Sequence, residues 1–279
     1  MKPNADSAAA GIRLENDFIV LRLDAHGRVL SIVSKTDGQE YCRGPLSFWT
    51  LKSRGRRSAA SALSCVGDLW TVSFPQATAV FRVSVAAHYV AFRLVSVTSS
   101  HPVQELALVR LPVRALATEA RTLNAVYDGR VAFGVMSLSL PVRGTLDEGV
   151  LTATGYGEFG LEGNGAAIIG CPFASFRQVI EEVETREGLP CIRLGGAWGK
   201  SSPDVKRSYL FIQDLSEENC DRVIRAAQTM NAGMIMVLES WCDAVSGHFP
   251  ISPRLFPHGL DGLRRTVDRI HAAGMKAGL

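Results

Sequence analysis

Apolar and β-branched residues come in short runs along the first two-thirds of the chain, and turn-forming residues separate these runs at hairpin spacing. Residues 18–23 and 28–33 form one such pair, and residues 81–85 and 89–95 form another in which apolar and polar positions alternate. Alternation with a period of two is typical of strands that have one buried face. Many short strands in series predict a large antiparallel β-sandwich over residues 1–200.

Three further apolar runs extend this pattern and are predicted strands: residues 106–111, 131–140 and 166–171. Two glycine-containing segments, residues 144–149 and 160–165, are interpreted as turns between strands. The second is glycine-rich, but it lacks the strand-then-helix context that a dinucleotide site needs. It therefore gives no indication of a nucleotide cofactor.

The pattern changes to helical spacing after residue 174. Ser175 and Gln178 have the spacing of a capping box, which predicts a helix over residues 175–187 with Ser175 capping the Gln178 amide. A stretch with Gly and Ser at residues 195–203 is interpreted as a domain boundary, and residues 208–213 predict one more strand.

The remaining chain alternates between helix and strand. Ser216 is a good N-cap for a helix whose apolar face includes Met230, and residues 234–238 form an uninterrupted apolar run. Such a run predicts a strand that is covered on both faces. A helix over residues 260–273 and a strand from residue 275 complete a βαβ unit.

These elements predict a multidomain β and α/β fold, in which residues 205–279 are the start of a (β/α)8 barrel. Because a closed barrel needs eight parallel strands, we expect the chain to be a C-terminally truncated fragment of a longer protein. The alternative is a complete protein whose last strand pairs with the sandwich.

Composition narrows the classes of function. The chain has 30 Lys and Arg against 27 Asp and Glu, a net charge of +3, and no apolar stretch long enough to span a membrane. We therefore expect neither a nucleic-acid partner nor a membrane partner. The short basic cluster of Lys52, Arg54, Arg56 and Arg57 is interpreted as a solvated loop.

The six cysteines form no C-x-x-C pair and are interpreted as free thiols, which favours a reducing compartment. The N-terminus lacks the apolar segment of a secretory signal, so a cytoplasmic location is favoured over secretion. The histidines near the end of the chain lack zinc-ligand spacing, and His271 is expected to pack on its helix. We predict no metal and no other cofactor. Three tryptophans are expected to serve packing rather than a sugar platform: Trp49, Trp70 and Trp198.

The segment best suited to chemistry is the loop at residues 239–258, between the apolar strand and its helix. Connections of this length are usually functional, and in α/β barrels the loops at the carboxyl ends of the strands line the active site. Glu239 offers a carboxylate to sugar hydroxyls, and Trp241 offers an apolar face to a pyranose. These two residues and Asp243 are the candidate substrate-binding residues. The alternative is that Glu239 is an ordinary loop acid and Trp241 covers the core.

Three motifs follow one another in this region: MIMVLESW at 234–241, FPHGLDGL at 256–263 and IHAAGMKAGL at 270–279. Their order resembles the opening of the catalytic barrel in the α-galactosidase (melibiase) clan of glycoside hydrolases. There a strand ending in an Asp-Asp-Gly-Trp-like motif precedes a Phe-Pro-x-Gly-Leu helix start and a Gly-(Leu/Met)-Lys-x-Gly-Leu strand. The segment LENDFIVL at 14–21 is similar to the galactose-mutarotase-like β-supersandwich that precedes such barrels.

The resemblance implies a glycoside hydrolase acting on α-linked sugars, with an oligo- or polysaccharide as substrate. Glu239 matches the second acid of the clan motif, which binds sugar hydroxyls, and Trp241 matches its Trp. Leu238 stands where the first acid would be, which puts galactose specificity in doubt. The clan's catalytic carboxylates lie on later barrel strands, so the resemblance implies that this fragment is inactive by itself.

Two other functions stay open from the sequence. One alternative is that the chain is a non-catalytic carbohydrate-binding or scaffold protein. The other is an epimerase that acts through the sandwich alone, which needs a histidine and a carboxylate in one cleft. His88 and His101 are the histidines available there, without a motif around them. The sugar, the linkage and the oligomeric state are not predicted.

Overall fold

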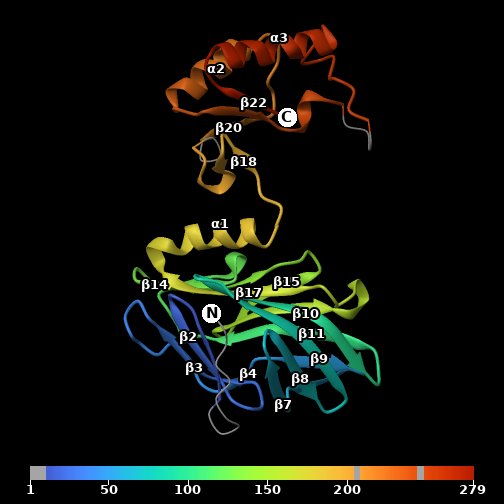
Figure 1. The fold of residues 1–279 in the computed structure, drawn as a ribbon. Coiled ribbons are helices and arrows are strands. Elements are labelled where there is room, and N and C mark those ends of the chain that lie inside the picture. Colours follow the sequence, from blue (N-terminus) through green and yellow to red (C-terminus); the bar gives the residue numbers. More distant parts are fainter. Residues whose placement is uncertain (1–10, 204–207, 244–247) are drawn as a thin grey trace. The chain divides into compact units, whose positions relative to one another are not determined.

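The computed structural model describes residues 11–203, 208–243 and 248–279, apart from the side chain of Glu239. The chain divides into two compact units, Met1–Pro190 and Cys191–Leu279, referred to below as the N-terminal and C-terminal units. Most of the described structure is antiparallel β-sheet with few helices, and a small parallel sheet lies in the C-terminal unit (Figure 1).

Three antiparallel sheets make up the described part of the N-terminal unit. The first has the order β1-β2-β3-β4, with the bounds β1 (Ile12–Glu15), β2 (Ile19–Leu23), β3 (Arg28–Ser34) and β4 (Leu46–Ser47). The largest has the order β12-β13-β14-β17-β10-β9-β8-β7, with the bounds β12 (Thr118–Ala120), β13 (Ala125–Tyr127), β14 (Val131–Ser137), β17 (Gly165–Pro172), β10 (Tyr89–Ser99), β9 (Ala77–Val85), β8 (Leu69–Phe74) and β7 (Ala62–Val66).

The third sheet carries the pocket described below. Its order is β15-β16-β11-β5-β6, with the bounds β15 (Val142–Asp147), β16 (Val150–Tyr156), β11 (Val103–Pro112), β5 (Thr50–Ser53) and β6 (Arg56–Ala59).

Short 3-10 turns lie between elements at η1 (Arg121–Leu123), η2 (Gly157–Phe159), η3 (Phe173–Ser175) and η4 (Gly199–Ser201).

The predicted hairpin pairs are confirmed, since β2 pairs with β3 and β9 pairs with β10, both antiparallel. The inner faces of the three sheets share one core, in which Trp49 and Trp70 are fully buried. The Trp49 ring lies 5.6 Å from that of Phe81 and 6.3 Å from that of Trp70. The packing role predicted for these two tryptophans is therefore confirmed.

Helix α1 (Phe176–Arg186) covers the outer face of the eight-stranded sheet through Phe176, Val179 and Val183. The predicted capping box is wrong, because Ser175 has helical backbone angles and makes no side-chain cap hydrogen bond. The chain enters α1 from the turn η3, so Ser175 lacks the extended backbone that directs an N-cap side chain to the helix amides.

The C-terminal unit starts with a short hairpin of β18 (Arg193–Leu194) and β19 (Ala197–Trp198). The elements that follow are β20 (Tyr209–Ile212), α2 (Cys220–Thr229), β21 (Met234–Val237), η5 (Glu239–Trp241), α3 (Gly259–Ala272) and β22 (Lys276–Gly278). Strand β21 pairs in parallel with both β20 and β22, which confirms the predicted βαβ unit.

Both helices pack on the same face of this parallel sheet (Figure 1). Ile235 and Val237 are buried beneath them, whereas Met234 and Met236 on the opposite face are half-buried. The prediction that this strand is covered on both faces is therefore wrong for the described chain. Met230, predicted on the apolar face of α2, is also exposed, because it lies just beyond the last helical residue.

None of the helices in the described ranges is both long and apolar enough to cross a membrane.

Candidate functional site

The sequence-predicted site residues lie at the carboxyl end of β21. Leu238 donates its amide hydrogen to the Ile212 carbonyl at 2.9 Å, which continues the parallel ladder up to η5. The side chain of Glu239 lies outside the described residues, so its contacts stay a prediction. Trp241 is half-buried, and Asp243 is exposed.

A short antiparallel contact closes the loop after η5. The Ser252 amide donates to the Trp241 carbonyl at 3.0 Å, and the Asp243 amide donates to the Pro250 carbonyl at 2.9 Å. The predicted residues at 244–247 lie outside the described residues. This pairing fixes the backbone positions of Trp241 and Asp243 next to the strand end.

Phe249 is an aromatic neighbour that sequence reasoning missed. Its ring stacks on that of Trp241, with centroids 6.2 Å apart and planes inclined by 23°. Phe249 is 63% exposed, while Trp241 packs against the cluster that contains Leu255 and Phe256. The two rings therefore present a partly exposed apolar surface, which suits the C–H face of a sugar ring.

Glu217, in the turn before α2, holds the other end of this loop. Its carboxylate accepts hydrogen bonds at 3.0 Å from the His258 amide and from Arg265, and it also contacts His258 Nδ1 at 3.0 Å. Desolvation opposes ionisation of Glu217, but these hydrogen bonds outweigh it, so the pKa of the carboxyl lies below its ordinary value. His271, predicted to pack on its helix, is exposed instead.

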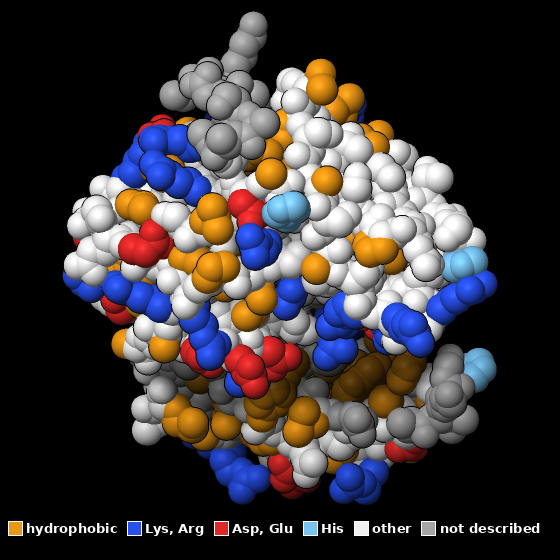
Figure 2. All heavy atoms as spheres, turned by 90° about the horizontal axis from the view of Figure 1, so that it is seen from below, with side chains coloured by type: hydrophobic (Ala, Val, Ile, Leu, Met, Phe, Trp, Pro, Cys, Tyr) orange, Lys and Arg blue, Asp and Glu red, His pale blue; other side chains and the backbone are white. Residues whose placement is uncertain are grey.

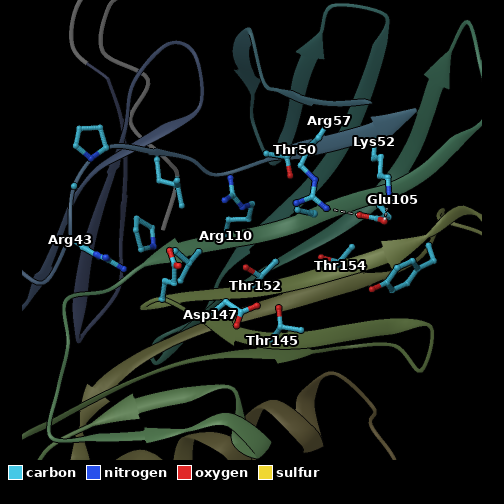
Figure 3. Close-up of a pocket in the computed structure, with 18 residues that line it drawn as sticks. Arg43, Thr50, Lys52, Arg57, Glu105, Arg110, Thr145, Asp147, Thr152 and Thr154 are labelled. Carbon is cyan, nitrogen blue, oxygen red and sulfur yellow. Dashed lines mark hydrogen bonds and ion pairs between the residues drawn. The ribbon is translucent and has the colours of Figure 1, made fainter. Parts of the chain in front are cut away.

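A second candidate site lies on the outer face of the five-stranded sheet in the N-terminal unit. It is a pocket with a volume of about 790 Å³, and we call it the sheet-face pocket (Figure 3). Its lining is mostly polar and comprises Arg43, Gly44, Pro45, Leu46, Thr50, Lys52, Arg57, Glu105, Ala107, Arg110, Pro112, Thr145, Asp147, Glu148, Val150, Thr152, Thr154 and Tyr156.

Two predictions about this region are wrong in part. Of the four residues predicted in a solvated loop, Arg54 does lie in an exposed turn. Lys52 and Arg57, however, lie opposite each other on β5 and β6 and line the pocket. Residues 144–149 were expected to form a turn, but Thr145 and Asp147 belong to β15. Only Glu148 and Gly149 form the turn, and both have positive φ, as a tight hairpin turn requires.

Glu105 is the acidic centre of the pocket. It accepts a hydrogen bond from Lys52 at 2.8 Å and one from Arg57 at 2.7 Å (Figure 3). The hydrogen bond from Lys52 and the ion pair with Arg57 hold the pKa of Glu105 below its ordinary value. On the face seen in Figure 2, basic and acidic side chains are interspersed.

The epimerase hypothesis requires a histidine and a carboxylate in one cleft. His88 does contact a carboxylate, but this contact lies outside the sheet-face pocket. The Nδ1 atom of His88 lies 2.5 Å from Glu182 of α1, and the His88 ring stacks on Phe18. Neither His88 nor Glu182 lines the sheet-face pocket. Across the described ranges, no group of three or more His, Cys, Asp or Glu side chains is arranged to hold a metal ion.

None of the six cysteines is joined in a disulfide bond, in agreement with the prediction. Burial raises the pKa of Cys65 and of Cys171 to about 12, which makes both poor nucleophiles. Cys242, next to the predicted site, is buried.

No known family model matches this chain, and no curated protein matches it. Among solved structures, it is similar to the α-galactosidase from Lactobacillus brevis, with 12% identity, a TM-score of 0.43, and coverage of 99% of this chain and 55% of that one. It is also similar to the cycloalternan-forming enzyme from Listeria monocytogenes in complex with a pentasaccharide substrate, with 10% identity, a TM-score of 0.36, and coverage of 98% and 31%. The chain thus spans about half the length of the first and a third of the second. A likeness of this extent identifies neither a reaction nor its residues.

Proposed function

We propose that this chain is part of a glycoside hydrolase acting on α-linked sugars. The N-terminal unit is then its galactose-mutarotase-like β-sandwich, and the C-terminal unit is the start of its (β/α)8 barrel. The parallel sheet is the observation that carries this proposal. Helices α2 and α3 cover one face, while Tyr209 and Phe211 on the other are 52% and 51% exposed. A barrel has its helices outside and bulky apolar side chains inside, so helices on one face and apolar side chains on the other support this assignment.

The proposed substrate site is the carboxyl end of β21, where barrel enzymes place their active-site loops. In this assignment Glu239 accepts hydrogen bonds from sugar hydroxyls, Trp241 packs on the C–H face of the ring, and Asp243 lies at the rim. A retaining glycosidase also needs two carboxyl groups roughly 5–5.5 Å apart across the scissile bond. We assign both to further barrel strands encoded after Leu279.

The test is to express the reading frame that contains this chain together with whatever follows Leu279, and to assay it on nitrophenyl α-glycosides. We expect the longer protein to hydrolyse at least one α-galactoside or α-glucoside, and residues 1–279 to hydrolyse none. Glu239→Gln removes a charged acceptor and lowers kcat/KM by about ten- to a hundredfold. Asp268→Asn, an exposed carboxylate on α3, is the matched control and leaves kcat/KM unchanged.

Each part of this proposal has an outcome that contradicts it. A stop codon directly after Leu279 contradicts the barrel. A longer protein that binds sugar but hydrolyses no α-glycoside favours the non-catalytic carbohydrate-binding alternative. An active enzyme in which Glu239→Gln keeps full kcat/KM removes Glu239 from the substrate site.

A further inference from the structure

The sheet-face pocket has the dimensions of a ligand site, and the hydrolase proposal does not use it. Its volume of about 790 Å³ lies within the usual range of ligand pockets, about 300–1,000 Å³. Ala107 lies in the middle of the sheet between Thr50 and Thr154. A small side chain flanked by longer ones on the neighbouring strands makes this part of the sheet a hollow.

A β-bulge directs Arg110 into this hollow. On the regular part of β11, Glu105 and Ala107 line the pocket, and Leu106 packs in the core. The register with β16 shifts between Ala107 and Val109, so one extra residue enters the strand. Without that shift Val109 would line the pocket and Arg110 would face the core. Bulges commonly re-aim a side chain beside a functional site.

The Arg110 guanidinium has no carboxylate partner in the described structure. Its Nη1 donates to the Ser47 carbonyl at 3.1 Å, and the Glu105 carboxylate on the same strand is bound to Lys52 and Arg57. Burial and the positive charge of Arg57 lower the pKa of Arg110. A half-buried cation next to a second cation is stabilised by an anion.

The whole lining indicates how much negative charge the ligand carries. Four basic and three acidic side chains line the pocket, so its formal charge is one positive. The acids at Asp147 and Glu148 disfavour a doubly charged group such as phosphate. Hydroxyl groups follow Arg110 across the sheet on one side, since Thr152 lies opposite it on β16 and Thr145 lies opposite Thr152 on β15. Hydroxyls both donate and accept hydrogen bonds, as sugar hydroxyls require.

We propose that the sheet-face pocket binds an acidic sugar, with a single carboxylate or sulfate group on Arg110 and the sugar hydroxyls on the threonines and Tyr156. Arginine suits this role because its planar fork binds such oxyanions through paired hydrogen bonds. The proposal rests on residues of the N-terminal unit alone, so it does not depend on the hydrolase assignment.

The test is calorimetric titration of residues 1–279 with galacturonate, galactose 6-sulfate, neutral galactose and inorganic phosphate at low salt. We expect an acidic sugar to bind at least about tenfold more tightly than galactose and phosphate, because a hydrogen bond to a charged group is stronger than one between neutral groups. Comparison of the first two probes distinguishes a carboxylate from a sulfate ligand.

Variants locate the binding. Arg110→Gln keeps a donor for the Ser47 carbonyl but removes the charge, and we expect it to weaken binding by about tenfold or more. Arg110→Lys retains part of the affinity. Arg82→Gln, an exposed arginine on β9 paired with Asp68, is the matched control and leaves affinity unchanged. Amide exchange of β11 in each variant shows whether the sheet stays folded.

The proposal is overturned if neither acidic sugar binds, or if neutral galactose binds equally well. It is also overturned if phosphate binds as tightly as the acidic sugars, because the pocket is then a general anion site. Unchanged affinity in a folded Arg110→Gln variant places the binding elsewhere on the chain.

Discussion

Asn124 ties together two sheets of the β-sandwich from a single position. Its side-chain amide donates to the Val135 carbonyl at 2.8 Å and to the Thr152 carbonyl at 3.0 Å, which lie on β14 and β16. The residue is buried, and its φ of +49° lies in the left-handed region that asparagine tolerates better than most residues. One side chain therefore satisfies two carbonyls and permits the turn after η1.

Replacing Asn124 separates these two roles. Asn124→Gly keeps the left-handed backbone but leaves both carbonyls without the amide, and we expect a loss of about 1–3 kcal/mol in the free energy of unfolding. Asn124→Ala adds the left-handed strain, about 1–2 kcal/mol more. Urea denaturation of both variants measures the difference. Equal stabilities for Gly and Ala would show that the backbone strain contributes nothing.

The two candidate sites differ in how far individual residues could be predicted. Trp241 follows an apolar strand directly, so its position at the strand end could be inferred from local pattern. Arg110 could not, because its direction depends on one extra residue in β11 that appears only when β11 pairs with β16. Lys52 and Arg57 resembled a solvated cluster because their partner, Glu105, is about fifty residues away in sequence.

At the scale of elements, α3 begins where Glu217 binds the His258 amide. Gly262 makes this contact possible, because a Cβ at that position would lie 1.9 Å from the Glu217 carboxylate. The pKa of Glu217 is lowered in the folded chain. A lowered carboxyl pKa adds stability above the unfolded pKa of about 4.3, and that stability is lost as the pH falls through the folded value.

We therefore expect the start of α3 to lose amide-exchange protection below about pH 4.3 in the native protein. Glu217→Gln lowers this protection at pH 7 and removes its dependence on pH below 5. Glu218→Gln, the exposed neighbouring carboxylate, behaves as the native chain does. Amide-exchange rates of the native chain and of both variants, corrected for the intrinsic effect of pH on exchange, measure this protection. Identical pH profiles for Glu217→Gln and the native chain would contradict the assignment.

Elements with a clear period were predictable, and their ends were less so. Strands β2, β3, β9 and β10 and helix α3 follow the pattern of their own residues. The start of α1 does not follow such a pattern. The 3-10 turn η3 leads directly into the helix, and the spacing between Ser175 and Gln178 gives no sign of this turn. Strand β15 was missed because two of its residues face the pocket and are polar, so the run resembles a loop.

At the scale of the whole molecule, the order of strands in the sheets depends on long-range pairing. Strand β17 lies between β14 and β10, although almost seventy residues separate β10 from β17. Local patterns predicted the strands and the change to α/β structure, but they contain no information on which distant strands pair. The sheet-face pocket needs β5, β11 and β16 side by side, so it was beyond prediction for the same reason.

The exposed face of the parallel sheet predicts that residues 1–279 self-associate. Tyr209 and Phe211 lie on β20 with ring centroids 4.8 Å apart, beside Met234 and Met236 of β21. An exposed apolar patch of this kind favours self-association. We expect residues 1–279 to bind an apolar dye and to associate as concentration rises, and the double variant Tyr209→Thr, Phe211→Thr to do both less.

The control for this experiment is Leu140→Thr, which removes a 96% exposed leucine in the N-terminal unit and leaves association unchanged. Sedimentation velocity over a range of concentrations measures the association of the native chain and of both variants. In the longer protein proposed above, the same side chains are inside the barrel, so dye binding falls and the double variant destabilises the fold. If the longer protein still binds dye at this face and tolerates both substitutions, the sheet is not part of a barrel.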